Sequence, residues 1–191
     1  MMGTVDKHWD PIVLVSVIAC LLIGWLVKAG VESRTIEFDD PEAGISLHYP
    51  ASWLTSEEED ALLEVLDPLT PSIFNTKLVI ASKEWNEDIE IGNFIVELTA
   101  KRGSSLPLYR TISLNPFQVN DLKAMKLEYA YAFDPIGVQA GVISVPIIVR
   151  AFDVILPYNG RVYIITLAAE EREYHRNLPS FHRILRSIQI Q

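Results

Sequence analysis

An uninterrupted apolar segment near the start of the chain precedes a longer, mixed sequence. Residues 12–27 contain no charged side chain, and the apolar pattern resumes after one lysine as far as Val31. A helix needs about 20 such residues to cross the hydrocarbon core of a bilayer, and Trp9 and Trp25 lie where interfacial indoles are favoured. We therefore predict an N-terminal flank at 1–10, a transmembrane helix at 11–31 and one aqueous domain at 32–191.

Two processed forms of this segment are alternatives to an uncleaved anchor. Secretory signals also have short apolar cores, but the residues that follow, Lys28-Ala-Gly-Val-Glu-Ser33, offer only a poor cleavage site. The segment Val17-Ile-Ala-Cys20 has the residue types of a lipoprotein processing site, although cleavage there would leave a very apolar mature N-terminus. The flanking residues favour the uncleaved anchor.

A stripe of small residues runs along the predicted helix. Ser16, Cys20 and Gly24 recur every four residues and therefore share one face. Small residues at this spacing allow two helices in lipid to approach closely and pack. The same spacing also arises by chance in a helix that contains several small residues. The stripe is a candidate helix-packing interface with integral membrane subunits of a larger complex.

Short apolar runs between turn-forming residues predict strands in the domain. Residues 35–38 and 45–49 flank the turn formers Asp39-Asp-Pro-Glu-Ala-Gly44, which indicates a hairpin-like pair. A β-rich stretch covers 77–85, and strict alternation of apolar and other residues predicts a strand at 127–133.

The last two predicted strands have a different pattern. Residues 147–156 and 161–168 are apolar on both faces and are joined by Pro157-Tyr-Asn-Gly160. Burial on two sides is typical of central strands, and the short turn makes these two antiparallel neighbours.

Two amphipathic helices complete the predicted domain. The first has Asn86 as its N-cap, acidic residues in its first turn, basic Lys101 and Arg102 at its end and Gly103 as its stop. The second is marked by apolar residues at 181–188 and is expected to begin near Pro179. The fold class is therefore α+β, an antiparallel sheet flanked by helices, with one N-terminal transmembrane helix.

Two segments resemble the PsbP/Mog1-like domains. Phe38-Asp-Asp-Pro-Glu-Ala-Gly-Ile-Ser-Leu-His-Tyr-Pro-Ala-Ser-Trp53 is similar to that family's opening turn, strand and Tyr-Pro-x-x-Trp. The strand Arg161-Val-Tyr-Ile-Ile-Thr-Leu-Ala-Ala169 and the later Phe181-His-Arg-Ile-Leu-Arg-Ser187 are similar to its closing pattern. The resemblance implies an α/β/α sandwich and a binding protein without catalytic activity. PsbP-like proteins are extrinsic or assembly subunits of photosynthetic membrane complexes on the lumenal side, and the Mog1 branch binds a small GTPase.

Composition removes several classes of function. The formal net charge is −9, which excludes nucleic acid as an expected partner because binding it needs a basic surface. Cys20 is the only cysteine, so no disulfide or cysteine metal site is expected. The histidines have no metal-ligand spacing, no nucleophile elbow or phosphate loop is present, and the metal contacts of plant PsbP proteins have no counterpart. We expect no enzyme activity, no cofactor and no metal.

Acidic residues are concentrated after the predicted anchor. Eleven acids and only one base, Arg34, lie between residues 32 and 67. A solvated acidic face that maintains solubility explains this charge, and a docking face for a basic soluble protein is the functional alternative. Calcium binding is disfavoured because the alternating oxygen ligands and glycine of a calcium loop are missing. The candidate docking residues are Asp39, Asp40, Glu57, Glu58, Glu59 and Asp60.

Together these features predict a non-catalytic, membrane-anchored accessory subunit that stabilises or caps a larger membrane complex, with photosynthetic or respiratory electron transfer favoured by the resemblance. The alternative is a membrane-tethered assembly factor that captures a soluble basic partner through the acidic face. The resemblance favours the periplasmic, extracytoplasmic or lumenal side. Positive charges lie on both sides of the helix and do not decide its orientation.

Overall fold

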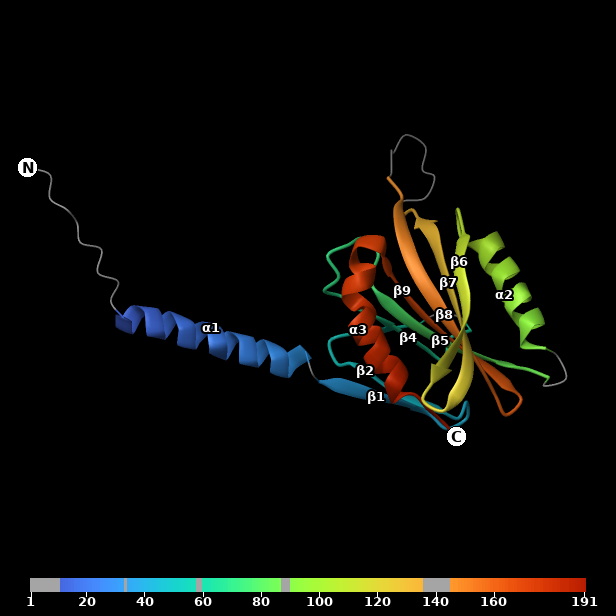
Figure 1. Ribbon diagram of the computed structural model, residues 1–191, viewed down its shortest axis with the longest axis horizontal. Helices are drawn as coiled ribbons and strands as arrows, with labels where there is room; N and C mark the ends of the chain where they lie inside the picture. Colours follow the sequence, from blue (N-terminus) through green and yellow to red (C-terminus); the bar gives the residue numbers. More distant parts are fainter. Residues whose placement is uncertain (1–10, 33, 58–59, 87–89, 136–144) are drawn as a thin grey trace, which may run out of the picture.

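The computed structural model describes residues 11–32, 34–57, 60–86, 90–135 and 145–191. The first element is the helix α1 (Pro11–Glu32), which extends away from the remainder of the chain (Figure 1). The predicted helix at 11–31 is thus present, and its described side chains, those of residues 13–24, are all exposed. Within the described residues, no helix combines the length and the hydropathy that crossing a membrane requires.

Most strands form one large antiparallel sheet. Its seven strands lie in the order β3-β4-β5-β9-β8-β7-β6. Their bounds are β3 Leu54–Ser56, β4 Leu63–Leu66, β5 Lys77–Glu84, β6 Arg110–Val119, β7 Leu122–Phe133, β8 Ile147–Tyr158 and β9 Arg161–Glu170. The strands β8 and β9 are antiparallel neighbours inside the sheet, which confirms the prediction from their two-sided apolar pattern.

A smaller sheet lies beside the first. It contains β1 (Thr35–Asp40), β2 (Ile45–Pro50) and β10 (Gln189–Ile190), with β2 in the middle. The antiparallel pairing of β1 with β2 confirms the predicted hairpin. Pairing of β10 with β2 brings the C-terminus back to the first strands of the domain.

The large sheet buries an apolar layer on each face. On β8, Phe152 and Val154 point into one buried cluster and Ala151 and Ile155 into the other, because successive strand residues face opposite sides. The first cluster includes residues of α3 (Glu171–Ser187), and the second includes residues of α2 (Ile91–Ser105). The helices therefore cover opposite faces of the sheet (Figure 1). This is the expected α+β architecture.

The predicted limits of the first amphipathic helix are wrong. The helix α2 begins after Glu90 rather than at Asn86, and Gly103 lies inside it. The helix ends at Ser105, and the next residue, Leu106, adopts extended angles of φ −104° and ψ 122°. Leu106 precedes Pro107, and a residue before proline is sterically disfavoured in the helical region. The proline, rather than the glycine, ends the helix.

The predicted start of the last helix near Pro179 is also wrong. The helix α3 begins at Glu171 and continues through Pro179. Pro179 lies on the exposed side of the helix, whereas Tyr174 and Phe181 on either side of it are buried. Burial of these aromatic rings compensates for the backbone hydrogen bond that proline cannot make.

Several strands were not predicted. The edge strand β6 exposes Ile112 and Leu114 and contains Pro116, so it lacks the clean alternation of a half-buried strand. A proline is tolerated there because an edge strand has one side without a pairing partner. The short strands β3, β4 and β10 are too brief to give a periodic signal.

An ionic cluster joins the sheet to α3. Oε1 of Glu128 accepts hydrogen bonds from Arg150 at 2.9 Å (Nε) and 2.7 Å (Nη2) and from the Tyr174 hydroxyl at 3.0 Å. Burial opposes ionisation of Glu128, but these bonds outweigh it and lower the pKa of Glu128 below its ordinary value of 4.5. The charged carboxylate therefore connects β7, β8 and α3.

Because the pKa of Glu128 is lowered in the folded protein, its stabilising effect is complete above pH 4.5 and is lost as the pH falls through the lowered value. We expect Glu128→Gln to reduce the free energy of unfolding near neutral pH by about 1.5–3 kcal/mol. The difference from the wild type should shrink on acidification. Urea unfolding at neutral and acidic pH measures both effects.

The exposed Glu97→Gln on α2 is the matched control for the loss of one carboxylate. If the Glu128→Gln difference is the same at both pH values, the ionised cluster does not stabilise the fold.

Candidate functional site

The predicted acidic docking residues that the structure describes lie in different places, with Asp39 and Asp40 at one hollow and Asp60 at another. Asp39 and Asp40 lie at the end of β1 and line a small depression near the C-terminal Gln191. Asp40 has a local structural role, because its Oδ1 accepts hydrogen bonds from the backbone N–H groups of Glu42 at 3.0 Å and Ala43 at 2.9 Å. Such a side chain stabilises a turn.

The second part of the predicted acidic face lies between β3 and β4. Glu57 and Asp60 are exposed, whereas Glu58 and Glu59 lie outside the described residues. Asp60 adopts a φ of 69° and lines a cavity against α2. The Asp60 side chain therefore lines this cavity.

The small-residue stripe lies on α1. Ser16, Cys20 and Gly24 fall in one continuous helix, and the Cys20 thiol is free and exposed. A Cβ added at Gly24 would meet no atom within 4 Å. The stripe is therefore open to another helix along this described stretch.

The predicted absence of a metal site was based on the histidines. Because α3 continues through Pro179, His175 and His182 lie on one helix, where both are exposed. Among the described residues, no three side chains of the metal-ligating types lie close enough together to hold an ion.

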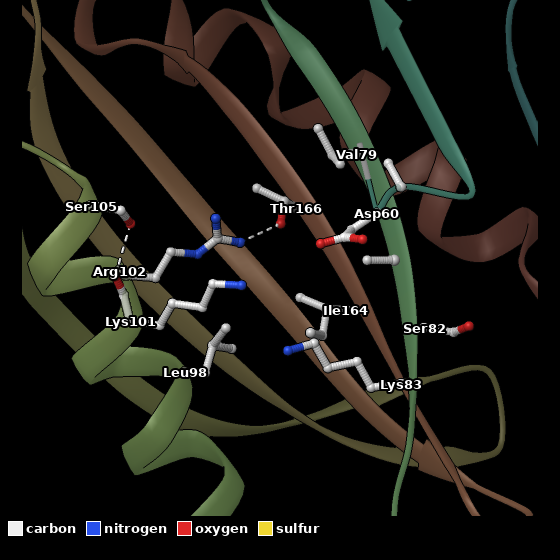
Figure 2. Close-up of a pocket in the computed structure, with 12 residues that line it drawn as sticks. Asp60, Val79, Ser82, Lys83, Leu98, Lys101, Arg102, Ser105, Ile164 and Thr166 are labelled. Carbon is white, nitrogen blue, oxygen red and sulfur yellow. Dashed lines mark hydrogen bonds between the residues drawn. The ribbon is translucent and has the colours of Figure 1, made fainter. Parts of the chain in front are cut away.

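The cavity beside α2 brings together charges that are distant in the sequence. It has a volume of about 430 Å³ and lies between α2 and the strands β5 and β9 (Figure 2). Its lining comprises Asp60, Ala61, Val79, Ala81, Ser82, Lys83, Leu98, Lys101, Arg102, Ser105, Ile164 and Thr166. This size falls within the usual range for small-molecule sites.

Three cationic side chains point into this cavity. Lys101 and Arg102 extend from α2, and Lys83 extends toward them from β5 (Figure 2). The Asp60 carboxylate faces the same space from the strand side (Figure 2). Ser105 is held back to the helix, because its hydroxyl donates a hydrogen bond to the Lys101 carbonyl at 2.8 Å.

Arg102 is positioned by a buried carboxylate. Its Nε and Nη2 donate hydrogen bonds to Asp153 at 3.3 Å each, and Nη2 also donates to the Thr166 hydroxyl at 3.0 Å. Asp153 is fully buried on β8, and it accepts further hydrogen bonds from Thr166 at 2.7 Å and Tyr129 at 3.1 Å. Four polar groups from α2 and three strands thus form one network.

Burial and charge act in opposite directions in this network. Burial raises the pKa of Asp153, while Arg102 and the two hydroxyls favour the carboxylate. Burial also opposes the charge on Arg102, but Asp153 outweighs it and raises the pKa of Arg102. Burial raises the pKa of Tyr129 well above its ordinary value, so its hydroxyl stays protonated and donates. The ion pair with Asp153 therefore holds the Arg102 guanidinium at the wall of the cavity.

The sequence contained a signal for this network that the prediction did not use. Asp153 is a charged residue inside a strand that is apolar on both faces, and such a residue needs a buried partner. Lys101 and Arg102 were explained only as favourable charges at a helix end. Lys83 gave no signal, because its closeness to α2 depends on the tertiary fold.

Solved structures share this fold. No protein-family model and no curated protein matches the sequence. The cyanobacterial PsbP protein CyanoP of Synechocystis is similar at a TM-score of 0.58 and 12% identity, over 82% of this chain and 92% of that one.

Two further solved structures have a similar fold. LpqN of Mycobacterium tuberculosis is similar at a TM-score of 0.53 and 16% identity, over 83% of this chain and 92% of that one. The Saccharomyces cerevisiae Ran-binding protein Mog1p is similar at a TM-score of 0.52 and 9% identity, over 82% of this chain and 95% of that one. The chain therefore has a PsbP/Mog1-like fold, and at these identities the similarity concerns the fold alone.

We expect Arg102→Met to destabilise the protein by about 3–5 kcal/mol, because it leaves the Asp153 carboxylate buried without its cation. The double variant Arg102→Met with Asp153→Leu should recover at least about 1 kcal/mol, because no buried charge remains. Urea unfolding measures the free energies, and Lys101→Met is the neighbouring control. A double variant that is as unstable as the sum of the two single variants would contradict this pairing.

Proposed function

We propose that this chain is a non-catalytic accessory subunit, anchored in a membrane by α1 and capping a larger membrane complex with its PsbP/Mog1-like domain. The observation that carries the proposal is the exposed apolar helix, whose described side chains include Val17 at 51%, Leu21 at 68% and Ile23 at 61% exposure. So many exposed apolar groups on one helix favour contact with a membrane or with another protein, and this supports the proposed anchor. In the sequence, the uncharged apolar run covers Ile12 to Val27 and is therefore longer than the stretch 13–24 whose side chains are described.

The fold supports a role in binding. The similar solved structures include a PsbP protein, a protein involved in cell envelope biogenesis and a Ran-binding protein. A complex of electron transfer, photosynthetic or respiratory, is the assembly that we propose for this chain. Its domain would lie on the extracytoplasmic or lumenal side, and the Ser16, Cys20 and Gly24 stripe would contact an integral membrane subunit.

We favour this subunit over a tethered factor that captures a basic protein through an acidic face. Asp40 is engaged in its own turn, and Asp60 faces the cations of the α2 cavity. Salt-sensitive capture of a basic soluble protein would favour the alternative instead.

Membrane anchoring predicts that the protein stays in the pellet after alkaline extraction. Replacing both Ile18 and Leu22 by arginine should release it, because each arginine at the centre of a membrane helix costs about 2.5–3.5 kcal/mol. Leu114→Arg, at an exposed apolar position on β6, is the matched control and should leave the protein in the pellet. A wild-type protein that is fully extracted would refute the anchor.

Contact through the stripe predicts that other membrane chains copurify in mild detergent. Gly24→Ile should reduce this copurification severalfold without loss of the fold, because a Cβ at Gly24 meets nothing within 4 Å in this chain. Ala19→Ile enlarges a small residue beside the stripe and should have a weaker effect. A wild-type protein that always elutes alone as a monomer would disprove the subunit role.

A further inference from the structure

The α2 cavity has donors that the described part of the fold does not use. Lys83 and Lys101 face it, and within the described part of the chain neither ammonium group forms an ion pair (Figure 2). Arg102 donates hydrogen bonds through Nε and Nη2 to Asp153 and Thr166. Its Nη1 forms no hydrogen bond to a described residue. Lys83 and Lys101 are exposed at the mouth of this hollow, and cationic side chains that converge there favour an anion that brings its own acceptor oxygens.

The charge balance limits the anion. Asp153 neutralises Arg102 across the cavity wall. Among the described residues that line the cavity, Asp60 supplies the one carboxylate that faces Lys83 and Lys101. Counted over these described lining residues, the hollow has an excess of one positive charge, which matches a monoanion, and Asp60 would repel a group with a higher negative charge.

The remaining walls are apolar. Leu98 on α2 and Ile164 on β9, which belong to one buried cluster, line the cavity together with Val79 and Ala81 on β5. Burying apolar surface here favours a ligand that has a hydrocarbon body as well as a charged end.

We infer that the α2 cavity is a binding site for a small amphipathic monoanion, a carboxylate attached to an aliphatic or aromatic body. Lys83 and Lys101 hold the carboxylate together with the free Nη1 of Arg102. Leu98, Ile164 and the β5 wall enclose the apolar body. This site does not depend on the proposed subunit role, since it lies in the domain and uses no residue of α1.

Methyl NMR of the full chain in detergent tests the site with phenylpropionate as the probe. We expect concentration-dependent shifts of the Leu98, Ile164 and Val79 methyl groups with a Kd of about 1 mM or tighter. The exposed methyl groups of Leu54 and Leu69 are internal controls for nonspecific partition into detergent. Acetate lacks the apolar body and phenylpropanol lacks the charge, so both should bind at least about tenfold more weakly.

Variants assign the charges. Lys83→Met and Lys101→Met each keep an apolar stem and should weaken phenylpropionate binding about tenfold. Asp60→Asn should strengthen it severalfold, because it removes a negative charge that faces the ligand. Lys123→Met, an exposed lysine on β7 that does not line the cavity, should leave the affinity unchanged.

Each remaining outcome overturns the inference. Shifts of equal size at Leu54 and Leu69, or no saturable shift at the cavity methyl groups, would show that there is no site here. Equal affinity for inorganic phosphate or phenylpropanol would show that the ligand class is wrong. Unchanged affinity in both lysine variants would show that the anion is not held by these ammonium groups.

Discussion

Two-sided burial of β8 and β9 is the constraint on which the rest of the structure depends. Ten consecutive ladder pairs join these strands, from Val149 with Glu170 to Tyr158 with Arg161. Apolar side chains on both faces must leave water, so each face of the sheet needs a cover. The helix α3 supplies one cover and α2 the other, and the small sheet packs against the α3 side through Ile45 and Leu47.

The buried carboxylate in β8 adds a second constraint to the first. Asp153 cannot remain in this interior without a partner, and Arg102 reaches it from the last turns of α2. That contact holds the end of α2 against the sheet on the side where Lys83 also emerges from β5. The Arg102–Asp153 ion pair thus compensates for the burial of the Asp153 carboxylate and also places the Arg102 guanidinium in the wall of the cavity. Stability and binding capacity share one group of residues.

The sequence was most informative where a pattern reflected strong burial. The β1–β2 hairpin, the β8–β9 pair and the layered α+β class followed from local periodicity and turn residues, and similarity to solved PsbP/Mog1-like structures supports that class. Helix limits were less predictable, because Pro107 ends α2 sterically while Pro179 is accommodated inside α3 by packing on its two sides.

The candidate site was predictable only in part. Asp153 was visible as a charge within an apolar strand, but its partner could not be identified, because Arg102 is 51 residues away in sequence. The convergence of Lys83, Lys101 and Asp60 depends on how β5, α2 and the β3–β4 segment are brought together. No local pattern encodes that arrangement. Such sites become apparent only after the tertiary fold is known.

The direct junction between α1 and the domain has a mechanical consequence. Helix α1 ends at Glu32 and β1 begins at Thr35, and two intervening residues extend about 7 Å at most. A longer flexible linker would let a tethered domain sample a wide volume and meet many partners. Under the proposed anchoring of α1 in a membrane, this short junction restricts the domain to the immediate neighbourhood of the end of its own helix. The choice of binding partner is then limited first by position, because the domain reaches only a partner that lies next to the end of α1.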